Sequence, residues 1–151
     1  MNEFKTINDV IDFAISEEEG AASFYRSLAE TAEKPMMKKI FIDFAVEEEG
    51  HKAKLESIKQ GTEIQAAAEN IVDLKIGDYM PDVMPSPEMN YQEALIMAMK
   101  KEKAAFRLYQ DLANISSDEN LKQIFFALAQ EEAKHKLRFE LEYDEHYLSE
   151  G

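Results

Sequence analysis

The sequence predicts an all-α fold, a bundle of four helices arranged as two helical hairpins. Gly and Pro are scarce, with 5 and 4 in 151 residues, while 32% of the residues are charged; long helices have this composition more often than turn-rich sheet proteins do. Signals for helix starts and ends recur along the chain, and its two halves resemble each other. A chain of this length fits a single domain, residues 1–151, with one core.

The first hairpin is predicted as two helices, at about 6–33 and 35–60. Thr6 and Asp9 form a capping-box pattern with Asp in the place of Glu. Pro35 suits the first turn of the second helix, because its missing N–H would have no partner there in any case. Gly61 suits the C-terminal cap of the same helix.

The second hairpin is predicted as two further helices, at about 90–115 and 117–147. Asn90 and Glu93 offer a capping box for the third helix, and Ser116 and Glu119 offer one for the fourth. Both hairpins therefore begin with a recognisable helix start and consist of helices of similar length.

The segment between the hairpins, about 61–89, contains three of the four prolines and shows no sustained period. A connection of this length is unusual unless it has a task. A linker of about 29 residues can span a helix of roughly 39 Å, so it can pass along the whole bundle before the third helix begins. The predicted topology is a four-helix bundle with one long crossover.

The charge and the residues that are absent restrict the classes of function. A net charge of -14 repels phosphate backbones and anionic lipids, so nucleic acid and membrane surfaces are excluded as expected partners and cations are favoured. The chain has no Cys, which leaves Glu, Asp and His as the side-chain metal ligands. No apolar run approaches the roughly 18 residues of a membrane span, and no signal-peptide pattern opens the chain. We therefore expect a cytoplasmic protein.

The two predicted hairpins are an internal repeat. At an offset of 84 residues, 15 of the 43 positions in 14–56 are identical to those in 98–140, without a gap. The identical pairs include Glu18 with Glu102, Tyr25 with Tyr109, Phe41 with Phe125, Glu48 with Glu132 and His51 with His135. A duplicated hairpin predicts a site of approximate two-fold symmetry.

Ionisable residues interrupt the apolar seam of each predicted helix. Alternating steps of four and three residues connect the seam positions, the spacing of a buried bundle interface. The ionisable seam residues are Glu18 in the first helix, Glu48 and His51 in the second, Glu102 in the third, and Glu132 and His135 in the fourth. Glu18 and Glu48 are equally far from the first bend, and Glu102 and Glu132 from the second. All six side chains should converge at the middle of the bundle.

Four buried carboxylates without partners would repel one another or take up protons, at a cost of several kcal/mol each. Two divalent cations balance four carboxylates and two neutral histidines, which predicts a dinuclear metal site. Glu and His without thiolate suit iron or manganese, with zinc able to occupy the same pocket. The alternative is a polar network, or a bundle that has lost its metal.

Other ionisable and polar residues have a simpler interpretation. The carboxylates beside the seam are assigned to a solvated face: Glu17, Glu19, Glu47, Glu49 and Glu131. His146 lies beyond the repeat and is expected to be an ordinary surface histidine. Tyr25 and Tyr109 lie two turns after Glu18 and Glu102 on the seam, where either a core position or a hydrogen bond to a ligand would suit them.

The combined pattern resembles the ferritin-like diiron-carboxylate superfamily, most closely its rubrerythrin branch. The pattern is Glu18-x6-Tyr25, Glu48-x-x-His51, Glu102-x6-Tyr109 and Glu132-x-x-His135, and it covers both hairpins. The resemblance implies a ferritin-like four-helix bundle with two irons, in which Glu48 and Glu132 bridge the metals. It further implies that Glu18 and Glu102 are terminal ligands, that each His binds one metal, and that the tyrosines donate to ligand carboxylates.

Two departures separate the chain from typical rubrerythrins. These carry an additional Glu three residues after the third-helix ligand, where this chain has Ala105, and a rubredoxin-like domain with four cysteines, which this chain lacks. The six-ligand set also resembles the ferroxidase centre of bacterioferritins. Few residues follow the fourth helix, however, which favours a homodimer or small homo-oligomer over a storage cage.

Three functions are compatible with this site. The first is a redox enzyme that reduces hydrogen peroxide or dioxygen with electrons from a separate donor protein. The second is a ferroxidase or iron-handling protein whose substrate is ferrous ion, which the negative charge of the chain would attract. The third is a non-enzymatic metal-dependent module. Manganese chemistry stays open as well, because these ligands do not separate manganese from iron.

Overall fold

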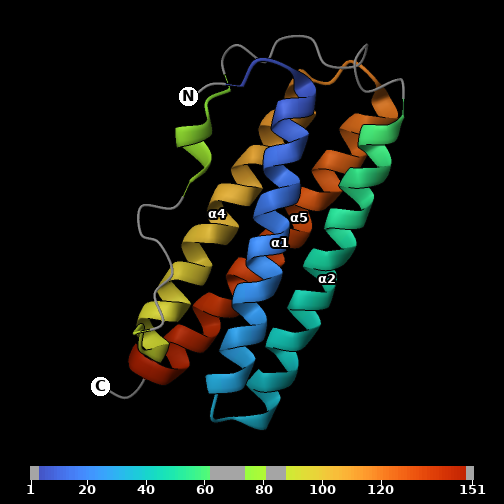
Figure 1. Ribbon diagram of the computed structural model, residues 1–151. Coiled ribbons are helices and arrows are strands. Elements are labelled where there is room, and N and C mark those ends of the chain that lie inside the picture. Colours follow the sequence, from blue (N-terminus) through green and yellow to red (C-terminus); the bar gives the residue numbers. More distant parts are fainter. Residues whose placement is uncertain (1–3, 62–73, 81–87, 149–151) are drawn as a thin grey trace.

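The chain folds into four long helices and no strand within the residues that the computed structural model describes, 4–61, 74–80 and 88–148. The helices are α1 (Ile7–Thr31), α2 (Pro35–Gln60), α4 (Tyr91–Ile115) and α5 (Glu119–Tyr143). A short 3-10 helix, η1 (Ile76–Tyr79), and a π-helical turn, η2 (Asp144–Leu148), complete the elements (Figure 1). The predicted all-α four-helix bundle is confirmed. None of the described helices is long and apolar enough to cross a membrane.

The helices form two antiparallel hairpins, α1 with α2 and α4 with α5 (Figure 1). Helix α4 starts at the end of the bundle where α1 turns into α2, although α2 finishes at the opposite end. The connection between α2 and α4 therefore passes along the bundle, as expected of the predicted long crossover. Of this crossover, 62–73 and 81–87 lie outside the described residues.

Local capping explains where the helices begin. Thr6 with Asp9 and Asn90 with Glu93 form the two predicted capping boxes, with both reciprocal bonds present in each. The capping box predicted for the fourth helix at Ser116 is wrong. Asp118 caps α5 instead, because its carboxylate accepts from the Leu121 N–H at 3.1 Å.

Ser116 belongs to the end of the preceding helix. Its hydroxyl donates to the carbonyl of Leu112 at 2.7 Å, so the side chain satisfies a carbonyl in the last turn of α4 rather than an N–H of α5. The fourth helix consequently runs from Glu119 to Tyr143, with η2 beyond it, where the sequence predicted 117–147.

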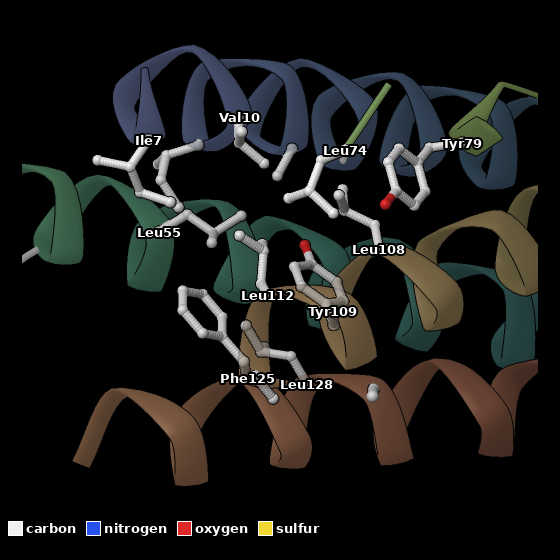
Figure 2. Close-up of a cluster of buried hydrophobic side chains, with 14 of the residues drawn as sticks. Ile7, Val10, Leu55, Leu74, Tyr79, Leu108, Tyr109, Leu112, Phe125 and Leu128 are labelled. Atoms are coloured by element: carbon white, nitrogen blue, oxygen red, sulfur yellow. The ribbon is translucent and has the colours of Figure 1, made fainter. Parts of the chain in front are cut away.

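Two apolar clusters fill the bundle. One contains Ile11, Leu55, Leu112 and Phe125, and the other contains Tyr25, Met37, Phe41 and Phe139. The described part of the crossover adds Leu74 and Tyr79 to the first cluster, where they lie near Leu108 of α4 (Figure 2). The Tyr79 hydroxyl also donates to Asp111 at 2.7 Å. The crossover is therefore anchored by buried contacts and not only by its ends.

Candidate metal centre

The structure places all six predicted seam residues in the bundle interior, where each side chain is at most 5% exposed. They come from all four long helices: Glu18 from α1, Glu48 and His51 from α2, Glu102 from α4, and Glu132 and His135 from α5. The six side chains therefore meet in the interior of the bundle, as the sequence predicts.

The six residues form two overlapping groups that could each hold a metal ion. Glu18, Glu48, His51 and Glu132 offer one such group, and Glu48, Glu102, Glu132 and His135 offer the other. Within each group the four ligand atoms lie within 4.8 Å of one another. Glu48 and Glu132 belong to both groups, so each of these carboxylates would contribute to both metal positions. Each group takes three residues from one hairpin and its fourth from the other.

The histidines point the same nitrogen inward. His51 Nδ1 lies 3.0 Å from Glu48, 3.3 Å from Glu18 and 3.4 Å from Glu132. His135 Nδ1 lies 3.2 Å from Glu102, 3.6 Å from Glu132 and 3.8 Å from Glu48. Both rings therefore present Nδ1 to the carboxylates and direct Nε2 toward residues farther out.

Two carboxylates assigned from the sequence to the solvated face contact these outer nitrogens. Glu131 lies 2.9 Å from His51 Nε2, and Glu47 lies 3.1 Å from His135 Nε2. Their side chains are 44% and 46% exposed, so the helical pattern alone predicts a surface position. The sequence does hold a signal for them, because Glu47 and Glu131 are identical at equivalent positions of the repeat.

These outer carboxylates fix the histidine rings. A carboxylate that accepts the outer N–H orients the ring, so that the inner nitrogen is directed toward a metal and can bind it once its own proton has been displaced. Each contact also crosses between hairpins, since Glu131 lies on α5 and His51 on α2, while Glu47 lies on α2 and His135 on α5. The site thereby uses these two carboxylates in addition to the six predicted residues.

Removal of the Glu131 carboxylate should weaken metal binding without removing a ligand. We expect Glu131→Ala to lower metal affinity by about 10- to 100-fold, because the outer partner of a ligating histidine sets its orientation and basicity. Calorimetric titration of the metal-free protein measures the change. Glu140→Ala is the matched control, because Glu140 lies on the same helix, is 42% exposed and pairs with Lys136. Equal affinities in both variants would show that the contact has no role.

The two predicted tyrosines donate hydrogen bonds crosswise between the hairpins. Tyr25 of α1 donates to Glu102 of α4 at 2.5 Å, and Tyr109 of α4 donates to Glu18 of α1 at 2.5 Å. Both rings are also fully buried core residues. The core position and the hydrogen bond were alternatives in the sequence, and the structure shows both.

Unpaired buried atoms gather at this site and indicate what it lacks. Among the described residues, both oxygens of Glu48, one oxygen each of Glu102 and Glu132, and His51 Nδ1 are buried and make no hydrogen bond of good geometry, although His51 Nδ1 and Glu48 lie 3.0 Å apart. A buried polar atom without a partner costs about 1–3 kcal/mol, more when it is charged. Oxygen and imidazole donors of this number and arrangement fit two divalent cations, which would supply every missing partner.

The electrostatics of the metal-free cluster agree with that fit. Burial, with repulsion from Glu48, raises the pKa of Glu18 to about 8 and the pKa of Glu102 to about 7. Burial and three neighbouring carboxylates raise the pKa of Glu132 well above its ordinary value. Burial also opposes the charge on Glu48, but the two histidines outweigh it and lower its pKa. The cluster therefore holds protons near neutral pH, at positions where cations would otherwise balance the charge.

A small cavity reaches the carboxylate side of the centre. It has a volume of about 20 Å³ and lies between α1 and α4, and the four ligand carboxylates are part of its lining. Ala21, Ala104 and Ala105 line it, together with the larger side chains of Phe13 and Tyr79. A space of this size holds a molecule of one or two heavy atoms. Ala105, at the position of the additional Glu of typical rubrerythrins, is thus part of the wall.

Of the remaining carboxylates beside the seam, Glu49 and Glu19 take up the predicted surface positions, whereas the surface position predicted for Glu17 is wrong. Glu49 pairs with Arg26 at 2.9 Å and Glu19 with Lys52 at 3.3 Å, both away from the centre. Glu17 is half-buried at the cavity, where burial raises its pKa. His146 is exposed, as predicted.

The fold and the buried cluster together define a ferritin-like bundle with a dinuclear carboxylate site. The rubrerythrin family model matches residues 9–143, and the chain belongs to that family. The predicted resemblance to the ferritin-like superfamily, rubrerythrin branch, is confirmed. A comparison with curated proteins gives no significant match.

Two solved structures share the fold. A candidate ferritin-like diiron-carboxylate protein from Thermotoga maritima superposes with a TM-score of 0.76 at 21% identity, covering 97% of this chain and 99% of that one. A hypothetical protein from Pyrococcus furiosus superposes with a TM-score of 0.72 at 25% identity, covering 92% of this chain and 89% of that one. The fold is therefore a shared architecture and not peculiar to this sequence.

Proposed function

We propose that the protein is a diiron oxidoreductase that reduces hydrogen peroxide or dioxygen, with electrons from a separate donor. The observation that carries the proposal is the pair of overlapping four-residue groups, which share two carboxylates and open onto a cavity of about 20 Å³. A shared pair of carboxylates suits two ions that react together on one small molecule. A cavity of this volume supports an oxidant no larger than peroxide or dioxygen.

The residues of the chain have separate tasks in this proposal. Two bound irons would supply one electron each, which is the demand of reducing one hydrogen peroxide to two waters. Glu48 and Glu132 hold the two metal positions together, while Tyr25 and Tyr109 fix the terminal carboxylates Glu102 and Glu18. The apolar clusters on either side keep bulk water away from the carboxylates.

Rapid mixing tests the proposal. The protein loaded with two ferrous ions per chain is mixed with peroxide and, separately, with dioxygen, and oxidation of the iron is followed by absorbance. We expect oxidation within seconds by at least one oxidant. Absence of oxidation by either within minutes would contradict an oxidoreductase function.

The alanine wall of the cavity gives a sharper prediction. Ala105→Leu should slow oxidation by the small oxidant, because three further carbon atoms fill a space of about 20 Å³. Metal stoichiometry should stay the same, since Ala105 is not in either ligand group. Stopped-flow rates measure the effect, and Ala53→Leu, at an exposed position of α2, is the matched control. An unchanged rate in Ala105→Leu would exclude this cavity as the route.

An iron-handling role is the second candidate. The net charge of -14 favours it, because an acidic surface concentrates ferrous ion. Stoichiometry separates the two candidates: oxidation of many more than two irons per chain, with the product retained, supports iron handling. Metal analysis of protein purified without added metal distinguishes iron from manganese, and tightly bound zinc would favour a non-enzymatic module.

A further inference from the structure

One half of the bundle contains a continuous series of aromatic rings that joins a site histidine to the surface. His135 stacks on Phe44 with 4.0 Å between ring centroids, and Phe44 contacts Phe139 at 5.4 Å. Phe139 contacts Phe41 at 5.9 Å, and Phe41 contacts Tyr91 at 6.2 Å. Tyr91 is the first residue of α4 and is only partly buried, so the series ends at the surface.

The same series has a second connection to the site and an exposed end. The Tyr25 ring lies 5.2 Å from Phe139, while its hydroxyl donates to the ligand carboxylate Glu102. Beyond Tyr91, the exposed ring of His146 lies at 5.4 Å, and Tyr147 lies 4.5 Å from His146. Aromatic contact is thus unbroken from the site to the end of the bundle where η2 lies.

The internal repeat shows that packing alone does not require three of the four rings between His135 and the surface, the exception being Phe41, which is equivalent to Phe125. The equivalent positions 84 residues away carry aliphatic side chains: Leu128 for Phe44, Leu55 for Phe139 and Ile7 for Tyr91. All three are buried members of the other apolar cluster, whereas Phe44 and Tyr91 are only partly buried. The aromatic series is therefore present on one side of a nearly symmetric site and absent, over the described residues, from the other.

Tyr91 is hydrogen-bonded to a buried carboxylate that has no counterpart at the equivalent position of the repeat. Glu142 is 1% exposed and accepts the Tyr91 hydroxyl at 2.9 Å, with Lys34 Nζ 3.3 Å away. The position equivalent to Glu142 is Ile58. Burial and the bond to Glu142 raise the pKa of Tyr91, so the phenol keeps its proton unless an electron leaves with it. A cavity of about 130 Å³ beside both residues has room for water.

We propose that Tyr91, with Glu142 as its proton acceptor, passes single electrons from an external reductant to the metal centre through Phe41 and Phe139. The inference rests on the proposed function. The reduction of dioxygen to two waters takes four protons, which come from solvent, and four electrons, of which two bound ferrous ions would supply only two. Tyr91 supplies the others in turn: its phenol loses one electron to the centre and its proton to Glu142, forming a neutral phenoxyl radical. A one-electron reductant then restores the electron, and Glu142 returns the proton.

Freeze-quench electron paramagnetic resonance tests the relay. Protein loaded with two ferrous ions per chain is mixed with dioxygen without a reductant, and frozen samples are measured while iron oxidation is followed optically. We expect a tyrosyl radical signal in the unmodified protein that ascorbate discharges. The signal should be lost in Tyr91→Phe and reduced in Glu142→Gln, which keeps the side-chain shape but cannot take the proton.

A second variant tests the rings between Tyr91 and the metal centre rather than Tyr91 itself. Phe44→Leu combined with Phe139→Leu installs the residues that the other hairpin carries, so the core should stay packed while the radical signal falls. Phe125→Leu is the matched control, because Phe125 is an equally buried ring of the other apolar cluster and lies outside the series. The control should keep the signal.

The outcomes distinguish a failure of the electron relay through Tyr91 from a failure of the proposed oxidoreductase function. Absence of iron oxidation would overturn the proposed function and the relay with it. Iron oxidation without a tyrosyl signal, or with a signal that Tyr91→Phe leaves unchanged, would overturn the relay alone. Loss of the signal in Phe125→Leu with its retention in the Phe44→Leu and Phe139→Leu double variant would also overturn it, since the electron would then pass through the other side of the site.

Discussion

Glu48→Ala is expected to abolish dinuclear metal binding. Glu48 is the α2 carboxylate of both ligand groups, and both of its oxygens are buried without a hydrogen-bond partner among the described residues. Its removal takes an oxygen donor from both metal positions at once. His135→Ala should also prevent a second ion from binding, because His135 supplies the imidazole of its group. Elemental analysis and calorimetric titration would show fewer than two metals per chain.

The neighbouring residue provides the matched control. Glu49 is next to Glu48 in sequence, but its side chain is 49% exposed and pairs with Arg26. Glu49→Ala should therefore retain two metals per chain. Equal damage from Glu49→Ala would mean that the wrong face of α2 has been assigned to the site. Glu48→Gln, which preserves side-chain shape, guards against loss of binding through misfolding, and circular dichroism reports whether the helices remain.

The free energy of unfolding of the metal-free protein is expected to fall as the pH rises from 6 to 8. Over the same range, the additional stability that bound metal confers on the protein should increase. A carboxyl whose pKa is raised by folding keeps a proton that the unfolded chain has already released, so folding becomes less favourable as the pH rises toward the folded pKa. This holds for Glu18 and Glu102, with pKa values of about 8 and about 7.

His135 acts in the same direction. Burial lowers its pKa, but Glu102 and Glu48 outweigh that effect and raise the pKa to about 10. The stability from this charged histidine is complete below about pH 6.5 and is lost as the pH rises toward 10. A tenfold difference in proton affinity between the folded and unfolded chain corresponds to about 1.4 kcal/mol, so the combined loss should reach a few kcal/mol. Bound metal displaces these protons, and its affinity therefore rises with pH.

Urea unfolding at pH 6 and pH 8, with a chelator and with manganese, measures both slopes. General repulsion from a net charge of -14 would also lower stability at higher pH, but about 1 M salt screens exposed charges over roughly 3 Å. The buried cluster is screened much less. A pH dependence that disappears in high salt, or a metal-free protein that is more stable at pH 8, would contradict this origin.

The fold and the six inner residues could be predicted because two independent regularities of the sequence coincide there. Helical spacing places Glu48 and His51 on a buried seam, and the repeat produces the same pair at Glu132 and His135. Charged residues at the surface do not in general follow both the helical spacing and the repeat. Glu and His residues elsewhere in the chain could therefore be assigned to solvent-exposed positions.

Sequence patterns fail where a side chain acts away from its own helix face. Glu131 occupies a surface position on α5, yet its carboxylate reaches a histidine of another helix. Helical periodicity describes where a side chain starts and not where a long, flexible one ends. Leu74 and Tyr79 were missed for a different reason, because a crossover without a period gives no pattern from which burial could be inferred. Ser116 matched a capping pattern that Asp118 fulfils two residues later.

The crosswise bonds of Tyr25 and Tyr109 have a consequence for the origin of the chain. Each hairpin supplies three residues of one ligand group and the fourth residue of the other group. A single hairpin therefore has an incomplete ligand group, which a second copy of the same hairpin would complete. A symmetric pair of separate hairpins would present the same two ligand groups, as expected of a chain built by duplication of one hairpin. Because the crossover joins the two hairpins, their association takes place within one chain, where the effective concentration of the partner hairpin is on the order of millimolar and independent of expression level.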